Sequence, residues 1–130
     1  MKVKFIILGC GSSLGVPNAA GNWGNCNPRE RKNYRTRCSA LIKSKNKNIL
    51  IDTSPDLRYQ LLKNNISNID RVFYSHKHAD QVHGINDLRV FYLKRRKKYQ
   101  YTRMVRLKNI LSKISHIVLK ALMSTKQFYK

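Results

Sequence analysis

Histidine and aspartate residues cluster in one short segment of the chain. The segment 76–83 reads His-Lys-His-Ala-Asp-Gln-Val-His and holds three of the four histidines. Two histidines two residues apart, with an aspartate two residues later, can converge on one metal ion, because imidazole nitrogens and carboxylate oxygens are ordinary zinc ligands. A metal ion with an open coordination position lowers the pKa of bound water to about 7 and supplies a hydroxide nucleophile. The spacing therefore predicts a metal-dependent hydrolytic site.

The alternative is that these histidines are ordinary polar surface residues. Their concentration directly after an apolar segment, together with an aspartate, favours the metal site. His116, the fourth histidine, lies in a basic segment. We expect it to be one residue of a helix face rather than a ligand.

The elements around the cluster follow from local composition. Segment 2–8 is rich in β-branched and aromatic residues, which predicts a strand. Segments 38–43 and 48–53 are predicted as two strands around the turn 44–47, and segment 69–75 as the next strand. A helix is predicted to begin with Ser54 as N-cap, Pro55 in the first position and Asp56 near its positive end, and to stop at Asn64. A second helix is predicted over 85–93. The order of elements indicates an α/β fold.

Composition limits the class of protein. A chain of 130 residues with 42% hydrophobic residues is expected to form one small domain rather than a disordered chain. No transmembrane segment and no signal peptide are expected, because no long apolar run exists. Three cysteines, Cys10, Cys26 and Cys38, argue against a disulfide framework and favour the cytoplasm. We expect Cys26 and Cys38 to be small packed thiols.

Charge is distributed unevenly. The net charge is +21, and residues 94–130 hold 12 of the 27 Lys and Arg residues but none of the 6 Asp and Glu residues. Apolar residues recur there at helical spacing. This basic segment predicts binding to nucleic acid or to an anionic membrane. The alternative cause is an AT-rich gene, because the codons of Lys, Asn and Ile are AT-rich.

Several ordered motifs together resemble one family. Residues 76–80, directly after a predicted strand, resemble the His-x-His-x-Asp-His signature of the metallo-β-lactamase-fold hydrolases. The flanking motifs are similar to the branch that contains PhnP-type cyclic-phosphate phosphodiesterases and tRNA 3′-processing nucleases. These motifs are residues 8–17, 21–26, 35–39, 50–58 and 84–89. The resemblance covers residues 3–93 and none of the basic segment.

The resemblance implies roles for individual residues. His76 and His78 would bind the first metal ion, which would be Zn²⁺ or Mn²⁺. Asp80 would bind the second and orient the nucleophilic water, as the catalytic residue. Asp52, at the end of a core strand, would brace the site from behind its ligands. The implied substrate is a phosphodiester, either a small molecule or RNA.

One position departs from the family signature. Gln81 stands where the signature has histidine, and glutamine is a poor zinc ligand, so the second metal site is weakened. His83, two residues later, either replaces that ligand or is only a neighbour at the start of a helix.

The family fold is an αββα sandwich of two halves, and the resemblance covers the N-terminal half. In relatives, a histidine, a bridging aspartate and a final histidine come from the second half. Here His116 is the one histidine after His83, and no acidic residue follows Asp87. We therefore expect a partial domain over 1–93, a basic helical or disordered tail over 94–130, an incomplete metal site and an inactive or impaired hydrolase.

A change of reading frame would explain why residues 94–130 do not resemble the corresponding part of the relatives. Relatives continue into a strand that resembles Ile-Pro-Val-Tyr-Ala-Asp. Back-translation of residues 98–105, read from the third base of the Lys98 codon, permits that sequence. We hypothesise that the frame is lost near residues 94–98. The alternatives are coincidence, since degenerate codons permit many sequences, and a genuine nucleic-acid-binding tail.

Overall fold

The structure is a computed structural model that describes residues 2–45, 47–91 and 100–103. Its strands form one five-stranded sheet in the order β1-β2-β3-β4-β5. They are β1 (Lys4–Gly9), β2 (Ser39–Lys43), β3 (Asn48–Ile51), β4 (Arg71–Tyr74) and β5 (Gln100–Arg103). β1, β2 and β3 are antiparallel neighbours, whereas β4 runs parallel to β3 and β5 runs parallel to β4.

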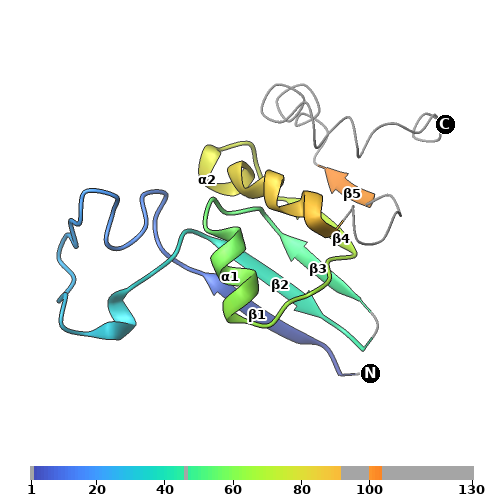
Figure 1. Ribbon diagram of the computed structural model, residues 1–130, viewed down its shortest axis with the longest axis horizontal. Helices are drawn as coiled ribbons and strands as arrows, with labels where there is room; N and C mark the ends of the chain where they lie inside the picture. The colour runs from blue at the N-terminus through green and yellow to red at the C-terminus, as the bar shows by residue number, and fades with distance from the viewer. Residues whose placement is uncertain (1, 46, 92–99, 104–130) are drawn as a thin grey trace.

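The helices that cover the sheet are α1 (Leu57–Lys63), α2 (Ala79–Val82) and the 3₁₀ helix η2 (His83–Leu88). Figure 1 shows them in front of the strands. Between the sheet and these helices lies the hydrophobic core. Its fully buried aliphatic side chains are Leu41, Leu50, Leu57, Ile69 and Val82. The segment 10–38, which contains the short 3₁₀ helix η1 (Arg31–Asn33), extends away from the sheet.

The other face of the sheet is largely apolar, and none of the described helices covers it. Successive residues of a strand point to opposite faces, so the strand register identifies the residues that share this face. One row contains Phe5, Ile42, Ile49 and the charged Arg71, and the next contains Ile7, Ala40, Ile51 and Phe73. Phe5 is 63% exposed and Ile7 is 65% exposed. Among the described elements, the helices therefore cover one face only.

The predicted strands are confirmed to within two or three residues at each end. The start of the first helix is wrong, because α1 begins at Leu57 and its N-cap is Asp56 rather than Ser54. Ser54 instead closes a turn before the helix: its Oγ accepts a hydrogen bond from Asp56 N at 3.1 Å. The second helical segment begins at Ala79, six residues before the predicted start at Ile85.

The prediction of packed thiols is also wrong for Cys38, which is exposed, while Cys26 is half-buried. Among the described helices, none is long and apolar enough to cross a membrane. The predicted helical or disordered tail is wrong at Gln100–Arg103, because this segment forms strand β5 beside β4. Residues 94–99 and 104–130, including His116, lie outside the described residues.

Candidate functional site

The histidine-rich segment forms the connection from β4 to α2. Ser75 to His78 follow the last residue of β4, and Asp80 lies in the first turn of α2. The carboxyl ends of parallel strands are the usual place for ligand-binding loops in α/β sheets. His76 and His78 are exposed, and their rings meet edge to face with centroids 4.6 Å apart.

Asp52 holds this connection from the neighbouring strand. It follows β3, is 7% exposed and has a φ of 59°. Its Oδ1 accepts a hydrogen bond from Ser75 N at 2.7 Å, and its Oδ2 accepts one from Ser75 Oγ at 2.6 Å. The carboxylate thus fixes the residue that immediately precedes His76.

The same contacts orient the imidazole ring of His76. Ser75 Oγ lies 2.9 Å from His76 Nδ1. A hydroxyl group has one hydrogen, and here Asp52 accepts it. His76 Nδ1 must then carry the proton and donate to Ser75 Oγ, which leaves the Nε2 lone pair free to bind a metal ion.

Thr53 attaches α2 to the end of β3. Thr53 N donates to Gln81 O at 2.7 Å, and Thr53 O accepts from Gly84 N at 2.9 Å. Thr53 Oγ1 lies 3.1 Å from Val82 O. A Cβ atom at Gly84 would overlap the carbonyl oxygen of Ser54, so the close approach of η2 to residues 53–54 requires glycine here.

Gln81 is buried and contacts the candidate ligand Asp80. Its side chain is 6% exposed, and Nε2 donates to Asp80 Oδ2 at 3.0 Å. Its Oε1 has no hydrogen-bond partner among the described residues. The amide therefore occupies one oxygen of the Asp80 carboxylate. His83, in contrast, is exposed at the start of η2.

The donor types fit Zn²⁺ or Mn²⁺, but the site is partial. The structure brings the rings of His76 and His78 together, and Asp80 follows in the first turn of α2. Within the described part of the chain, no three His, Cys, Asp or Glu residues lie close enough to hold a metal ion. A catalytic zinc ion needs three protein ligands and a water molecule.

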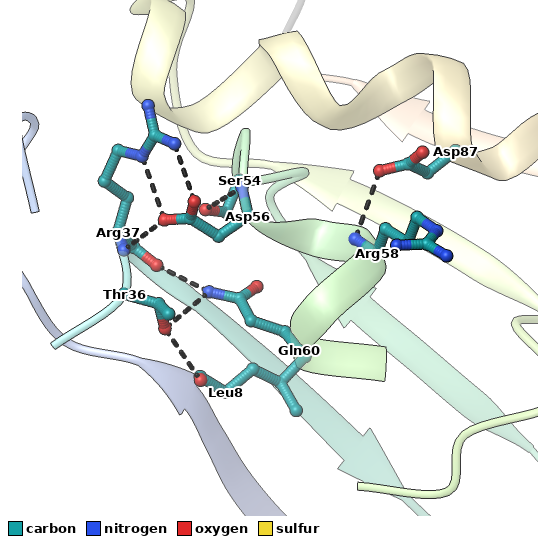
Figure 2. Close-up of polar contacts among 8 residues, drawn as sticks. All are labelled: Leu8, Thr36, Arg37, Ser54, Asp56, Arg58, Gln60 and Asp87. Atoms are coloured by element: carbon teal, nitrogen blue, oxygen red, sulfur yellow. Dashed lines mark hydrogen bonds and ion pairs between the residues drawn. The ribbon is translucent and has the colours of Figure 1, made fainter. Parts of the chain in front are cut away.

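An ion pair at the N-terminus of α1 was not foreseen from the sequence. Arg37 Nη2 lies 2.6 Å from Asp56 Oδ1, and both Arg37 Nε and Arg37 N donate to Asp56 Oδ2 at 2.9 Å (Figure 2). The hydrogen bonds from Arg37 hold the pKa of Asp56 below its usual value. Those same bonds raise the pKa of Arg37, and the nearby charge of Asp80 adds to that effect.

Gln60 supports the ion pair from α1. Its Nε2 donates to Arg37 O at 2.7 Å and to Thr36 Oγ1 at 3.1 Å, and Thr36 Oγ1 donates to Leu8 O (Figure 2).

Ser75 and Thr53 were not identified from the sequence as site residues either. Their one sequence signal is position, since each lies next to a predicted site residue at the end of a strand.

Comparison with known proteins identifies similar chains. The family model described as "Beta-lactamase superfamily domain" matches residues 47–116. A protein named octanoyltransferase from Porphyromonas gingivalis (strain ATCC BAA-308 / W83) is 43% identical over 88 residues, which are 67% of this chain and 18% of that protein. A solved diphosphatase from the PhnP family is 27% identical with a TM-score of 0.80, covering 91% of this chain and 48% of that one.

Two more distant structures share the fold. Zn²⁺-bound PqqB from Methylobacterium extorquens is 21% identical with a TM-score of 0.64, covering 93% of this chain and 46% of that one. Human tRNase Z, short form, is 18% identical with a TM-score of 0.61, covering 96% of this chain and 42% of that one.

This chain therefore spans slightly less than half the length of these solved structures, and a smaller share of the curated relative. The predicted α/β fold and the resemblance to PhnP-like proteins and tRNA-processing nucleases are confirmed. Because the family model matches more than half of its residues, the chain belongs to the β-lactamase superfamily, with the hydrolase-like fold of that group.

Proposed function

We propose that this chain carries one part of the metal centre of a phosphodiester-cleaving hydrolase. The observation that carries the proposal is the connection after β4, in which His76 is oriented through Ser75 by the buried carboxylate of Asp52. The similar proteins described as a PhnP-family diphosphatase and as tRNase Z support a substrate with a hydrolysable phosphorus–oxygen bond. We propose a phosphodiester, either a small molecule or RNA.

In this proposal His76 and His78 bind the first metal ion, Zn²⁺ or Mn²⁺, and Asp80 binds the second. The metal centre would supply a hydroxide nucleophile and neutralise phosphoryl oxygens. The chain's own contribution is orientation: Asp52 and Ser75 hold the Nε2 lone pair of His76 free. His83 replaces the missing ligand only if α2 and η2 turn its ring toward Asp80.

We further propose that the 130-residue chain hydrolyses phosphodiesters poorly or not at all. Its candidate donors come from a single connection, and one oxygen of Asp80 is taken by the Gln81 amide. Fewer than three converging ligands bind zinc weakly. Activity would need further donors beyond those of the described residues.

Measurements of metal binding and of hydrolysis test the proposed metal centre and the proposed loss of activity. Equilibrium dialysis measures the affinity of the full chain for Zn²⁺ and Mn²⁺, and release of nitrophenol from bis(p-nitrophenyl) phosphate measures hydrolysis. We expect weak binding and hydrolysis near the buffer rate. His78→Ala is expected to abolish the binding, whereas Gln81→His, which adds a ligand and frees Asp80, is expected to strengthen it at least about tenfold.

His116→Ala is the matched control, because it removes the one histidine that we expect not to be a ligand. His83→Ala decides the role of His83: a loss of affinity would make it a ligand, and unchanged affinity would assign it no ligand role. Metal binding that is equal in the wild type, His78→Ala and Gln81→His would contradict the proposed centre. Rapid hydrolysis by the wild-type chain would contradict the proposed impairment.

Residues 94–130 support a second candidate function, because 12 basic side chains without one acidic side chain favour nucleic acid or an anionic membrane surface. Such binding would weaken steeply with salt and would disappear when residues 94–130 are deleted. A salt-independent interaction that survives the deletion would contradict it. In either reading we place the protein in the cytoplasm.

The frame-loss proposal concerns the same residues. The backbone of β5 pairs in parallel with β4 over Gln100–Arg103, where the shifted frame permits the strand typical of relatives. DNA sequence from codon 90 to beyond the stop codon tests this. A shifted frame that continues with histidine and aspartate motifs of the family supports a broken gene. A shifted frame that encodes anything else makes the basic segment genuine protein.

A further inference from the structure

The irregular segment between β1 and β2 begins and ends at a cysteine. Cys10 directly follows β1, Cys38 directly precedes β2, and the chain between them extends away from the sheet (Figure 1). Both cysteines are exposed free thiols, whereas Cys26, within the segment, is half-buried. The two exposed thiols therefore lie at the neck of the segment, although they are far apart in the sequence.

The strand register places these two cysteines opposite each other. Gly9 pairs with Ser39 at the end of the β1–β2 ladder. The next bridge along the chain joins Gly11 to Arg37. On each side, the residue between the two bridges is a cysteine. Opposed residues of neighbouring strands have Cα atoms about 4.5–5.5 Å apart, which lies within the range of about 4.4–6.8 Å that a disulfide requires.

The two side chains also point to the same side of the sheet. A Cβ atom on Gly9 would meet the side chain of Gln60 on α1, so position 9 faces the helices and Cys10 faces away from them. Ser39 is buried, and Cys38, the residue before it, is exposed. Both thiols therefore lie on the face of the sheet that none of the described helices covers.

A direct contact ties the sulfur of Cys38 to the opposite strand. Cys38 Sγ donates to Gly11 O at 3.1 Å, and Gly11 is the residue that follows Cys10. Partial burial raises the pKa of the Cys38 thiol, and the charge of Asp80 adds to that effect. Cys38 therefore stays protonated at neutral pH. Because the thiolate is the reactive form, we expect Cys38 to be the second of the two sulfurs to react.

We propose that Cys10 and Cys38 form a reversible disulfide in the presence of a peroxide. Cys10 Sγ attacks one peroxide oxygen, the O–O bond breaks and one water leaves, which gives a sulfenic acid. Cys38 Sγ then attacks the Cys10 sulfur, the S–O bond breaks, and the hydroxide leaves with the Cys38 proton as a second water. The two thiols lose two electrons in total, and hydrogen peroxide gains them. Thiol reductants restore both cysteines by exchange.

The disulfide would close the neck of the segment 10–38. Ser39, next to Cys38, donates through its Oγ to Asp52 O at 3.1 Å, so the closed neck is attached to the end of β3. Disulfides of this kind in the cytoplasm are transient and redox-sensing rather than structural. The proposal uses neither the candidate metal ligands nor the basic segment, and it goes beyond the proposed hydrolytic function.

The test treats the reduced full-length chain with hydrogen peroxide at neutral pH, blocks the remaining thiols with iodoacetamide and maps tryptic peptides by mass spectrometry. Trypsin separates peptide 38–43 from peptide 5–29, which holds both Cys10 and Cys26. We expect these two peptides to be crosslinked through Cys10, as fragmentation of the crosslinked pair shows. Free thiols are expected to fall from three to one per chain, and dithiothreitol is expected to restore all three.

Cys26→Ser is the matched control, because it removes the cysteine that does not lie at the neck. It is expected to form the same crosslinked pair of peptides and to retain no free thiol. Cys10→Ser and Cys38→Ser are each expected to lose the crosslink. The urea concentration at the unfolding midpoint is expected to rise on oxidation of the wild type and of Cys26→Ser, because the bond restricts the unfolded chain. It is expected to stay unchanged in the other two variants.

Oxidation in concentrated urea separates strand register from chance. Loop closure in an unfolded chain favours the pairs that are closer in sequence, Cys10 with Cys26 and Cys26 with Cys38. We therefore expect the Cys10–Cys38 bond to be the main product in the folded chain and a minor product in urea. Equal yields of this bond in both conditions would overturn the proposal. A folded wild-type chain that pairs Cys26 instead, forms only bonds between chains or keeps three free thiols would overturn it too.

The outcome is distinguishable from that of the proposed metal centre. A chain that forms the Cys10–Cys38 bond but binds no Zn²⁺ keeps the disulfide proposal and contradicts only the metal centre. A chain that binds Zn²⁺ but fails to form the bond does the reverse. Circular dichroism of each reduced variant establishes that the fold is intact.

Discussion

Ser75 donates to both oxygens of the Asp52 carboxylate, through its amide at 2.7 Å and its hydroxyl at 2.6 Å. These two bonds tie the ends of the parallel strands β3 and β4 together directly before His76. Hydrogen bonds to a charged acceptor are each stronger than neutral ones. A buried carboxylate in this position therefore contributes both to stability and to the orientation of the first candidate ligand.

Asp52→Asn tests this double role. Asparagine tolerates the positive φ of this position, but its amide group cannot accept from both donors of Ser75. We expect the free energy of unfolding to fall by about 1.5–3 kcal/mol, and Zn²⁺ affinity to fall about 10- to 100-fold, as is typical when the partner of a ligand is removed. Urea unfolding and equilibrium dialysis measure the two effects.

Ser75→Ala is the companion variant, because it removes the hydroxyl and keeps the amide. It is expected to affect metal affinity more than stability. Zn²⁺ affinity within twofold of the wild type in both variants would show that the contact is structural and does not orient His76.

The Arg37–Asp56 pair makes stability depend on pH. Because Arg37 lowers the pKa of Asp56 in the folded state, the stabilisation is complete above the ordinary aspartate pKa of about 3.9. It is lost as the pH falls through the lower, folded-state pKa. Asp56→Asn is expected to lose about 1–2 kcal/mol at pH 7 and to be less sensitive to acid than the wild type.

Urea unfolding of both proteins at pH 7 and near pH 3 checks this expectation. The difference between wild type and variant is expected to shrink at the lower pH. A difference that stays constant, or grows, as the pH falls would show that the ion pair does not stabilise the fold.

Local patterns predicted much of this fold. Short apolar runs between turn residues located β2, β3 and β4. The asparagines at 64–65 correctly marked the end of α1, where Asn64 is the C-cap. The start of α1 was predicted two residues too early. Asp56 does stand at the helix N-terminus as the N-cap, but its carboxylate bonds to Arg37, which is 19 positions away in the sequence, and makes no capping hydrogen bond to the first turn.

For the candidate site, too, the sequence predicted the segment but not its tertiary contacts. Residue types and spacing pointed to the segment 76–83 without any structure. They could not show that Gln81 turns its amide onto Asp80, or that Thr53 holds α2 by its backbone, because these contacts depend on how β3 and α2 pack.

Gly84 is expected to tolerate no side chain. In Gly84→Ala the new Cβ would overlap the carbonyl oxygen of Ser54, which is backbone and cannot rotate away. We expect a loss of more than about 2 kcal/mol in unfolding free energy. Gly21→Asn is the control, because nothing lies near that position and asparagine accepts its φ of 79°. Equal stability of Gly84→Ala and the wild type, measured by urea unfolding, would contradict the close approach of η2 to residue 54.

The open face of the sheet is expected to bind a hydrophobic dye and to promote self-association, because contiguous exposed apolar surface does both. Ile7, on edge strand β1, is 65% exposed, so Ile7→Lys removes apolar surface at little structural cost. We expect its unfolding free energy to stay within about 0.5 kcal/mol of the wild type, with weaker anilinonaphthalene sulfonate fluorescence and less association in sedimentation velocity.

Leu41→Ala is the contrasting variant, because Leu41 lies on the opposite face of the sheet and is fully buried. Its unfolding free energy is expected to fall by about 2–5 kcal/mol. Dye binding and association that are unchanged in Ile7→Lys would mean that this face is already covered in solution.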